Sequence, residues 1–227
     1  MTVELTSSIV KEYGLEAGAD IVGIAQIDDF IKAPKGFNPT DALPDCHSVI
    51  VLGGTFSPED YKSVDKYSAT RNAMLSKMTE IAKRLAKRLK KEGYNTKAIS
   101  AAGGKWVQGE GRKELLGYIS LKHAAEIAGL GVIGKNYLLT NPKYGNLLWL
   151  SAVLTDAVLE PDERITQEIC TSCMKCVNGC PIGALDDQSK FKRKECSSFY
   201  MIEDKKFKLK CYKCRTVCPN CNGMQTE

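Results

Sequence analysis

The residues best suited to chemistry in this chain are cysteines crowded near its C-terminal end. Nine of the ten cysteines lie between Cys170 and Cys221. The stretch CTSCMKCVNGCP, residues 170–181, has the spacing C-x2-C-x2-C-x3-C followed by proline. This spacing is typical of bacterial ferredoxins, in which three closely spaced thiolates bind one iron-sulfur cluster and the fourth binds another. The sequence therefore predicts a segment that carries two clusters and moves single electrons.

A second, incomplete copy of the motif begins at Cys211 and ends with the cysteine–proline pair 218–219. Its first cysteine is missing, because Lys208 stands at that place. We expect Cys196 to supply the ligand from a longer loop, with Cys221 as the alternative. The predicted ligand sets are Cys170, Cys173, Cys176 and Cys218 for one cluster, and Cys180, Cys196, Cys211 and Cys214 for the other.

Zinc sites and disulfides are the other common uses of clustered cysteines. Pairs with C-x2-C spacing also build tetrahedral zinc sites, but such sites need neither the x2-x2-x3 rhythm nor the proline. The first residues lack the apolar run and cleavage site of a signal peptide, so we expect a cytoplasmic protein without disulfides. Cys46 stands apart from the other cysteines, and we expect it to be a small buried apolar residue.

Composition and charge limit the possible partners. No stretch approaches the roughly 20 apolar residues of a membrane helix, so no membrane partner is expected. The formal net charge is +5 at pH 7. Because an oxidised four-thiolate cluster carries about −2, two clusters would leave about +1, which does not imply general affinity for nucleic acid. A chain of 227 residues suits one core and a small module. We place the domains at 1–160 and 161–227.

Before residue 160, the pattern of apolar residues predicts the strands and helices that must position these cysteines. Apolar runs predict buried strands at residues 19–27, 48–56, 95–100 and 146–154. Apolar residues three and four apart predict helices at residues 4–16, 64–92 and 121–128. Ser120 is placed to cap the last of these helices. The glycine-rich residues 101–117 yield no prediction.

The stretch GLGVIG, residues 129–134, has the G-x-G-x-x-G spacing of dinucleotide-binding loops. In those sites the glycines follow a strand and open a helix, whose N-terminus faces the pyrophosphate. Here the predicted helix precedes the glycines, and Pro142 and Gly145 prevent a long helix from following. The order of elements therefore argues against nicotinamide binding. It leaves a helix-ending loop and a loop for another ligand equally open.

Three segments taken together resemble the epoxyqueuosine reductase and reductive dehalogenase superfamily. They are ISLKHAAEIAGLGVIGKNYLLTNPKYGNLLWLSAVLTD (119–156), the two-cluster segment after it, and CSSFYMIED, which begins at Cys196. The resemblance implies an α+β fold, with a nitroreductase-like α/β sandwich core and an appended bacterial-ferredoxin-like domain that holds two [4Fe-4S] clusters. It also implies base-off cobalamin on the core, reduced by the nearer cluster.

The resemblance further implies that the glycine loop forms part of the wall of the corrinoid pocket. The residues concerned are Gly129, Gly131, Gly134, Lys135 and Asn136. Epoxyqueuosine reductases carry an acidic proton donor in a D-S-G-P-like segment, whereas this chain has AISAAGG (98–104), which contains no carboxylate. Tyr118 and His123 are the candidate replacements, since a histidine that titrates near neutrality suits acid–base work.

These observations predict an enzyme, a cobalamin-dependent iron-sulfur reductase that acts on a small molecule. The first alternative is a non-catalytic electron carrier or reductive activator for a partner corrinoid protein. The second is a flavin-dependent reductase with FMN in the cleft. Epoxyqueuosine reductases continue into helical repeats that hold tRNA, whereas this chain ends six residues after Cys221. We therefore expect a short form, for which a tRNA substrate is disfavoured.

Overall fold

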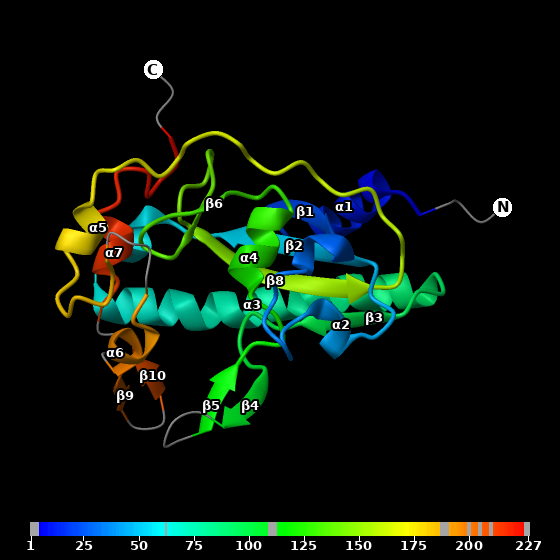
Figure 1. The fold of residues 1–227 in the computed structure, drawn as a ribbon, viewed down its shortest axis with the longest axis horizontal. Helices are drawn as coiled ribbons and strands as arrows, with labels where there is room; N and C mark the ends of the chain where they lie inside the picture. The colour runs from blue at the N-terminus through cyan, green and yellow to red at the C-terminus, as the bar shows by residue number, and fades with distance from the viewer. Residues whose placement is uncertain are drawn as a thin grey trace. The chain divides into compact units, whose positions relative to one another are not determined.

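The chain forms two compact units in a computed structural model (Figure 1). The structure describes residues 5–61, 63–108, 113–186, 191–198, 201–203, 206–208 and 211–224. The first unit comprises Met1–Gly54, Leu75–Leu130 and Trp149–Ile165. The second unit comprises Thr55–Met74, Gly131–Leu148 and Thr166–Glu227. The second unit therefore contains the cysteine segment together with residues 55–74 and 131–148. The sequence prediction, with its boundary after residue 160, places these two earlier segments in the first domain.

A four-stranded sheet forms the centre of the first unit. β1 pairs with β2, and β8 pairs with β3, in antiparallel fashion, so that Ile24 lies opposite Ile50 and Ile99 lies opposite Ala152. The four predicted strands are all confirmed. In spatial order they are β1 (Ile21–Gln26), β2 (Ser48–Thr55), β8 (Leu148–Thr155) and β3 (Thr96–Ile99).

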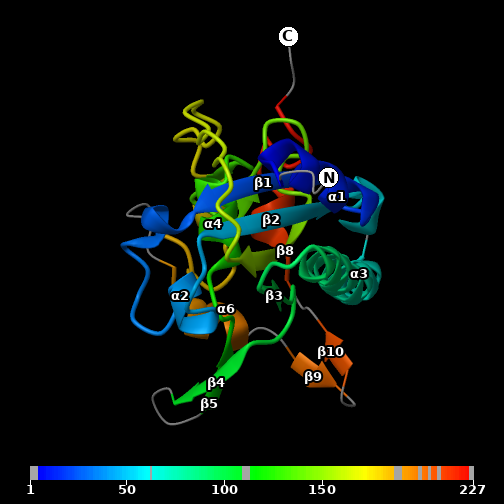
Figure 2. The ribbon, with the colours of Figure 1, turned by 90° about the vertical axis from the view of Figure 1, so that its right-hand side faces the viewer.

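Helices pack on both faces of this sheet, as Figure 2 shows. The three predicted helices are confirmed with slightly different ends. They are α1 (Ser7–Glu16), α3 (Val64–Lys91) and α4 (Leu121–Ile127). Two short turns lie between β1 and β2, namely the 3-10 helix η1 (Ile27–Phe30) and α2 (Pro39–Ala42).

Two glycines allow α1 and the segment after α4 to lie close to the sheet. A Cβ on Gly14 of α1 would lie 2.7 Å from a methyl group of Val22. A Cβ on Gly23 would lie 2.3 Å from the carbonyl oxygen of Ala128. Because successive side chains of a strand point to opposite faces, these two contacts lie on opposite sides of β1. This double cover explains why β2, with its continuous apolar run, is buried on both faces.

The apolar stripe of α3 supplies much of the core of the first unit. Met78, Ile81, Leu85 and Leu89 are each at most 1% exposed. The helix ends before Gly93, which has a left-handed φ of 98°. The stripe therefore packs the core, as its spacing predicts.

A hairpin of β4 (Lys105–Gln108) and β5 (Lys113–Leu116) fills the stretch for which the sequence yields no prediction. It extends away from the sheet of the first unit (Figures 1 and 2). Trp106 pairs with Leu115, and these side chains are 68% and 42% exposed. An exposed hairpin lacks the alternation of buried and exposed residues on which sequence prediction depends.

The second unit includes the first part of α3, up to Met74. Its other described elements are short. No described helix of either unit is long and apolar enough to cross a membrane. The elements are η2 (Pro58–Tyr61), β6 (Val132–Ile133), β7 (Leu139–Thr140), α5 (Lys175–Asn178), α6 (Arg193–Ser198), β9 (Met201–Glu203), β10 (Lys206–Lys208) and α7 (Lys213–Thr216).

Candidate metal centre

One cavity in the second unit collects four of the predicted ligands. It contains about 410 Å³ of space, part of which is open to solvent. Its wall includes the whole set predicted for the first cluster, namely Cys170, Cys173, Cys176 and Cys218. The structure thus brings the last cysteine of the second motif together with the first three cysteines of the first motif.

The local backbone turns the first three thiols toward this cavity. Met174 has a left-handed φ of 54°, which is uncommon for a residue other than glycine, and it reverses the chain just before α5. Cys176, in α5, is 8% exposed. Asn220 fixes the return of the chain, because its side-chain amide donates a hydrogen bond of 2.6 Å to the carbonyl of Ile169. Ile169 itself is buried and forms part of the cavity wall.

The segment 131–148 forms another part of the cavity wall. The backbone N–H of Lys135 donates a hydrogen bond of 3.3 Å to the Sγ atom of Cys170. A Cβ on Gly134 would lie 3.4 Å from the same sulfur. A backbone N–H that points at sulfur stabilises a thiolate and tunes a bound cluster. The end of the GLGVIG stretch therefore contacts a predicted cluster ligand directly.

Interactions in the structure connect only some of the four cysteines predicted to bind the second cluster. Besides burial, negative charge on Cys196, on Cys211 and on Cys176 of the first set raises the pKa of Cys214, so these thiols lie near it. The Sγ atom of Cys180 accepts a hydrogen bond of 3.2 Å from the backbone N–H of Ala184. All four cysteines of this set are partly exposed.

Cys221, the alternative to Cys196, lies beside the other set. It interacts electrostatically with Cys218. Its side chain is 8% exposed, and its thiol donates to the Oδ1 atom of Asn146 at 3.5 Å. The backbone N–H of Asn146 in turn donates to the carbonyl of Cys221 at 3.0 Å. The structure thus gives the Cys221 thiol a partner within the protein.

Burial controls the acidity of the thiols around the site. It raises the pKa values of Cys176 and Cys218, and it raises the pKa of Cys214 to about 11. At Cys214 the positive charge of Arg215 opposes this rise. Because a thiol must lose its proton to bind a metal, binding at these cysteines releases protons and is favoured by rising pH.

The arrangement of donors fits a polynuclear cluster. Within the part of the chain that the structure describes, no three His, Cys, Asp or Glu side chains converge closely enough to hold one metal ion. The four thiols of the first set are instead distributed around a cavity wall. A cubane cluster suits such a wall, because each thiolate binds a different iron atom at a corner of the cluster.

The structure gives two glycines of the GLGVIG stretch a packing reason of their own. α4 leads into these glycines and the two-residue strand β6 follows, so the strand–glycine–helix order of a dinucleotide site is absent. A Cβ on Gly129 would lie 2.3 Å from the carbonyl oxygen of Glu163. A Cβ on Gly131 would lie 2.5 Å from that of Thr140. Their role in a corrinoid pocket stays a prediction.

Asn136 is held by the chain itself. It is 5% exposed, and its Nδ2 atom donates to the carbonyl of Cys214 at 3.3 Å. Its Oδ1 atom accepts from the backbone N–H of Leu138 at 3.0 Å. Asn136 thus anchors the glycine loop to the second cysteine motif, and contact with a corrinoid stays a prediction for this residue also.

The two candidate proton donors lie in the first unit. The Nδ1 atom of His123 is 2.7 Å from the hydroxyl of Ser120, so this serine contacts the histidine rather than capping α4 with its side chain. His123 is exposed and lines a separate cavity together with Phe30 and Phe37; this cavity contains about 940 Å³ of space, part of which is open to solvent. Tyr118 is half-buried, with the Lys97 ammonium 4.5 Å from its ring centroid. Their predicted catalytic role remains untested.

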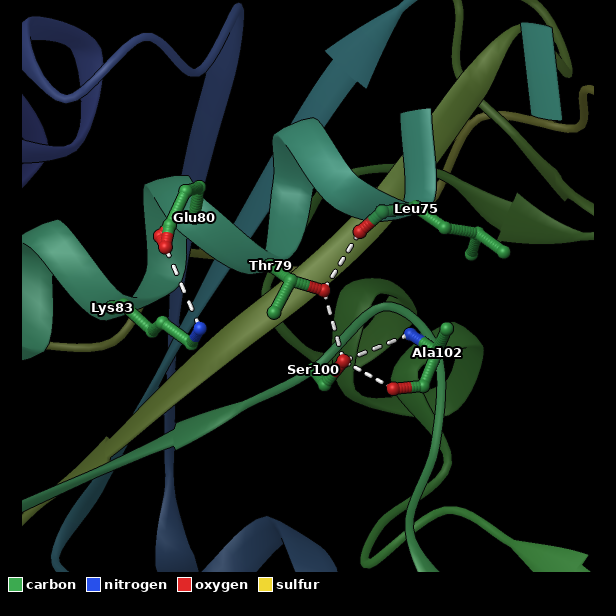
Figure 3. Close-up of polar contacts among 6 residues, drawn as sticks. All are labelled: Leu75, Thr79, Glu80, Lys83, Ser100 and Ala102. Carbon is green, nitrogen blue, oxygen red and sulfur yellow. Dashed lines mark hydrogen bonds and ion pairs between the residues drawn. The ribbon is translucent and has the colours of Figure 1, made fainter. Parts of the chain in front are cut away.

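The segment 98–104, which lacks a carboxylate, is fixed by hydroxyl groups (Figure 3). The hydroxyls of Ser100 and Thr79 lie 2.9 Å apart. The Thr79 hydroxyl also donates to the carbonyl of Leu75 at 2.7 Å, and the Ser100 hydroxyl contacts the backbone of Ala102. These bonds hold the segment against α3 through neutral groups. None of the hydroxyls of this network is a strong acid.

Cys46 fulfils its prediction as a buried apolar residue. It is 3% exposed, and its thiol donates to the carbonyl of Ser48 at 3.4 Å. Burial raises the pKa of this thiol to about 11, so it stays protonated and unreactive near neutral pH.

Comparison with known proteins identifies the class to which this fold belongs. The structure matches epoxyqueuosine reductase from Streptococcus thermophilus over 96% of this chain and 66% of that chain, with a TM-score of 0.64 and 19% identity. It matches a catabolic reductive dehalogenase over 95% of this chain and 32% of that one, with a TM-score of 0.70 and 19% identity. The fold is therefore the mixed helix-and-sheet fold that these reductases share.

Sequence comparison agrees with this class. The chain is 34% identical to the epoxyqueuosine reductase of Bacillus subtilis over 45% of its own length and 29% of that protein. It is 26% identical to the Pseudomonas aeruginosa enzyme over 92% of this chain and 67% of that one. No family model matches the chain. The chain is thus similar in sequence to epoxyqueuosine reductases and shares its fold with them and with a reductive dehalogenase, and its match spans only about a third of the first of these curated relatives.

Proposed function

We propose that this protein is an iron-sulfur reductase that passes electrons from two [4Fe-4S] clusters to a bound corrinoid and thereby reduces a small molecule. The observation that carries the proposal is the cavity lined by Cys170, Cys173, Cys176 and Cys218, with the glycine loop on the same wall. When bound, such clusters supply single electrons at low potential. The protein's part is to hold the thiols in place.

Contacts of the glycine loop support a corrinoid beside the first cluster. Gly134 and Lys135 both line the cysteine cavity, and the Lys135 N–H contacts Cys170. A flat ring bound against this loop would lie close to the first set of thiols. A short distance between donor and acceptor is what electron transfer requires. FMN on the same loop remains an alternative cofactor, because its flat ring would meet the same requirement.

The neighbours of Cys196 and Cys221 support Cys196 as the eighth ligand. Cys214 interacts with Cys196, whereas Cys221 interacts with Cys218 and bonds to Asn146. We expect Cys196→Ser to lose about four irons per chain and Cys221→Ser to lose none. The reverse result would assign the ligand to Cys221.

A second candidate function is an electron carrier that reduces a partner corrinoid protein. The hydroxyl network around Ser100 favours it, because that segment contains no carboxylate to donate a proton. If the protein is instead a catalyst, Tyr118 or His123 must supply the proton. In that case either His123→Gln or Tyr118→Phe should lose turnover while keeping its iron and cobalt content.

The substrate follows from the proposal only as a class. One solved relative is an epoxyqueuosine reductase with an epoxyqueuosine-modified tRNA-Tyr stem loop, which this structure matches with a TM-score of 0.64 and 22% identity over 97% of this chain and 66% of that one. We propose a small molecule rather than tRNA for this chain. Competition of a tRNA stem loop with turnover would contradict that choice.

Metal and cofactor analysis tests the proposal directly. The protein is purified anaerobically, reconstituted with iron and sulfide, incubated with hydroxocobalamin and freed of excess reagents. About eight irons with stoichiometric cobalt per chain are expected. About eight irons with neither cobalt nor flavin would favour the carrier, and retained FMN would favour the flavin reductase. Zinc without iron would contradict all three interpretations.

A further inference from the structure

The hairpin of β6 and β7 ends in a tight turn that the backbone itself closes. The N–H of Gly134 donates a hydrogen bond of 3.0 Å to the carbonyl of Leu138, and the N–H of Tyr137 donates one of 2.8 Å to the carbonyl of Gly134. Tyr137 has a left-handed φ of 57°. A hairpin loop of three residues is typically a type I turn followed by one left-handed residue. Lys135 and Asn136 therefore occupy the two central positions of the turn.

Side chains of the second unit hold this turn in one conformation. The ring of Tyr137 stacks on that of Phe191 with 5.0 Å between the ring centroids, which supports a left-handed residue that is not glycine. Asn136 is 5% exposed, and its amide donates to the carbonyl of Cys214 at 3.3 Å. Its Oδ1 atom accepts from the N–H of Leu138. Asn136 thus ties the turn both to its own backbone and to the second cysteine motif.

The first central N–H of the turn points at a predicted ligand. Because the turn closes through the N–H of Tyr137, the N–H of Lys135 lies outside that bond, and it donates to the Sγ atom of Cys170 at 3.3 Å. Gly134, Lys135 and Asn136 line the same cavity as Cys170. The sequence predicts these three residues only as a corrinoid wall, because the spacing of glycines does not show which sulfur the loop meets.

We propose that this turn raises the reduction potential of the first cluster through the N–H of Lys135, and that Asn136 is the positioning residue that holds this N–H at Cys170. The inference rests on the proposed function, because it requires the cluster to be present. Reduction adds one electron, taken from a low-potential one-electron donor, and makes the cluster and its thiolates more negative. A hydrogen bond strengthens as its acceptor gains negative charge, so the N–H stabilises the reduced form more than the oxidised form.

Two variants of Lys135 isolate this hydrogen bond. Lys135→Pro removes the N–H, and proline is favoured at the first central position of a type I turn, so the turn can still form. Lys135→Ala keeps the N–H. Both variants lose the same side chain and its charge, so the difference in potential between them reports the effect of the N–H.

A second pair of variants tests the positioning role of Asn136. Asn136→Ser keeps an oxygen that can accept the bond within the turn, and it loses the amide that holds the carbonyl of Cys214. Asn141→Ser is the matched control, because Asn141 is also buried on this segment. Its Oδ1 atom accepts from the backbone N–H groups of Lys143 and Tyr144, within its own turn.

A redox titration of the reconstituted holoprotein, followed by electron paramagnetic resonance, measures the potentials once iron content has been determined. We expect Lys135→Pro to lower the reduction equilibrium constant of one cluster at least about threefold relative to Lys135→Ala, which is about 28 mV at 59 mV per tenfold change. Asn136→Ser should lower the same constant at least about twofold, and Asn141→Ser should leave it unchanged. The cluster concerned should be the one that Cys196→Ser retains.

Each part of the inference has its own contrary result. Equal potentials in loaded Lys135→Pro and Lys135→Ala would overturn the role of the N–H, and an unchanged potential in loaded Asn136→Ser would overturn the positioning role. A shift confined to the cluster that Cys196→Ser loses would overturn the choice of cluster. Failure of Lys135→Pro or Asn136→Ser to load iron, with both controls loaded, would replace tuning by a role in assembly. Iron without cobalt in the unsubstituted protein would contradict the proposed function alone, whereas absence of iron would overturn both.

Discussion

The two units of this protein differ in what holds them together. Among the twelve largest side chains that are less than 2% exposed in the described part of the chain, only Ile169 belongs to the second unit. The first unit buries apolar side chains of α3 against a sheet that is covered on both faces. The second unit has short elements, and its buried positions include Cys176, Cys221, Asn146 and Arg215. An apolar core folds without help, whereas a thiol-lined cavity depends on its metal.

Loss of a cluster ligand should have the largest effect of these changes, because it should disrupt the second unit and leave the first unit folded. We expect Cys176→Ser to lose the first cluster and to open residues 166–224 to proteases, because metal binding and folding are coupled at such sites. Both tryptophans, Trp106 and Trp149, lie in the first unit. Their fluorescence should therefore still report a cooperative unfolding transition. Simultaneous collapse of both signals would show that the first unit also depends on the cluster. Cys46→Ala, which leaves all predicted ligands in place, is the control.

A cavity made in the apolar core should destabilise the first unit and leave the iron content of the second unit unchanged. Leu85 is 1% exposed in α3, and Leu85→Ala should lower the free energy of unfolding of the first unit by about 2–5 kcal/mol. The fall is measured by denaturant titration with tryptophan fluorescence, while iron content stays unchanged. Lys87→Ala, on the exposed side of the same helix, should change stability by less than about 0.5 kcal/mol. Equal losses in both variants would contradict this account of the core.

Raised pH should test the buried thiol of the first unit. Burial raises the Cys46 pKa from 9.0 to about 11, so the folded state favours the neutral thiol. This contribution is present below pH 9 and is lost as pH rises through 11, because the unfolded thiol ionises first. Relative to Cys46→Ala, the protein should lose about 2 kcal/mol between about pH 8 and 10.5. If the difference in free energy of unfolding between the two proteins stays constant across this pH range, the Cys46 pKa is not raised by burial.

The glycine at the end of α4 should matter even without any cofactor. Gly129 has a φ of 70°, and an added Cβ would lie 2.3 Å from the Glu163 carbonyl. Gly129→Ala should therefore destabilise the first unit by about 1–3 kcal/mol in the apoprotein. Gly93 has a φ of 98°, and an added Cβ there would meet nothing within 4 Å, so Gly93→Ala should cost only the backbone strain. Denaturant titration of both variants measures the difference, and equal effects would mean that the contact with Glu163 is unimportant.

Sequence patterns predicted the elements whose signals are local or strongly apolar. The run SVIVLGG predicted β2, and the spacing of Met78, Ile81 and Leu85 predicted α3. The β4–β5 hairpin was not predicted, because its pair Trp106 and Leu115 is exposed and no buried face imposes a pattern. The Ser120 hydroxyl was expected to cap α4, but the nearby His123 ring competes for it.

By itself, the sequence predicted the class of chemistry, because ligand spacing is a local property that a short loop can satisfy. The motif also predicted that Cys218 joins Cys170, Cys173 and Cys176, and the tertiary structure places these four around one cavity. It also decided that Asn146 and Arg215 are buried. The physical reason is that burial and the field of a fixed charge depend on which distant segments meet. Residues 55–74, 131–148 and 166–224 meet in one unit, and no spacing within any one of them specifies that meeting.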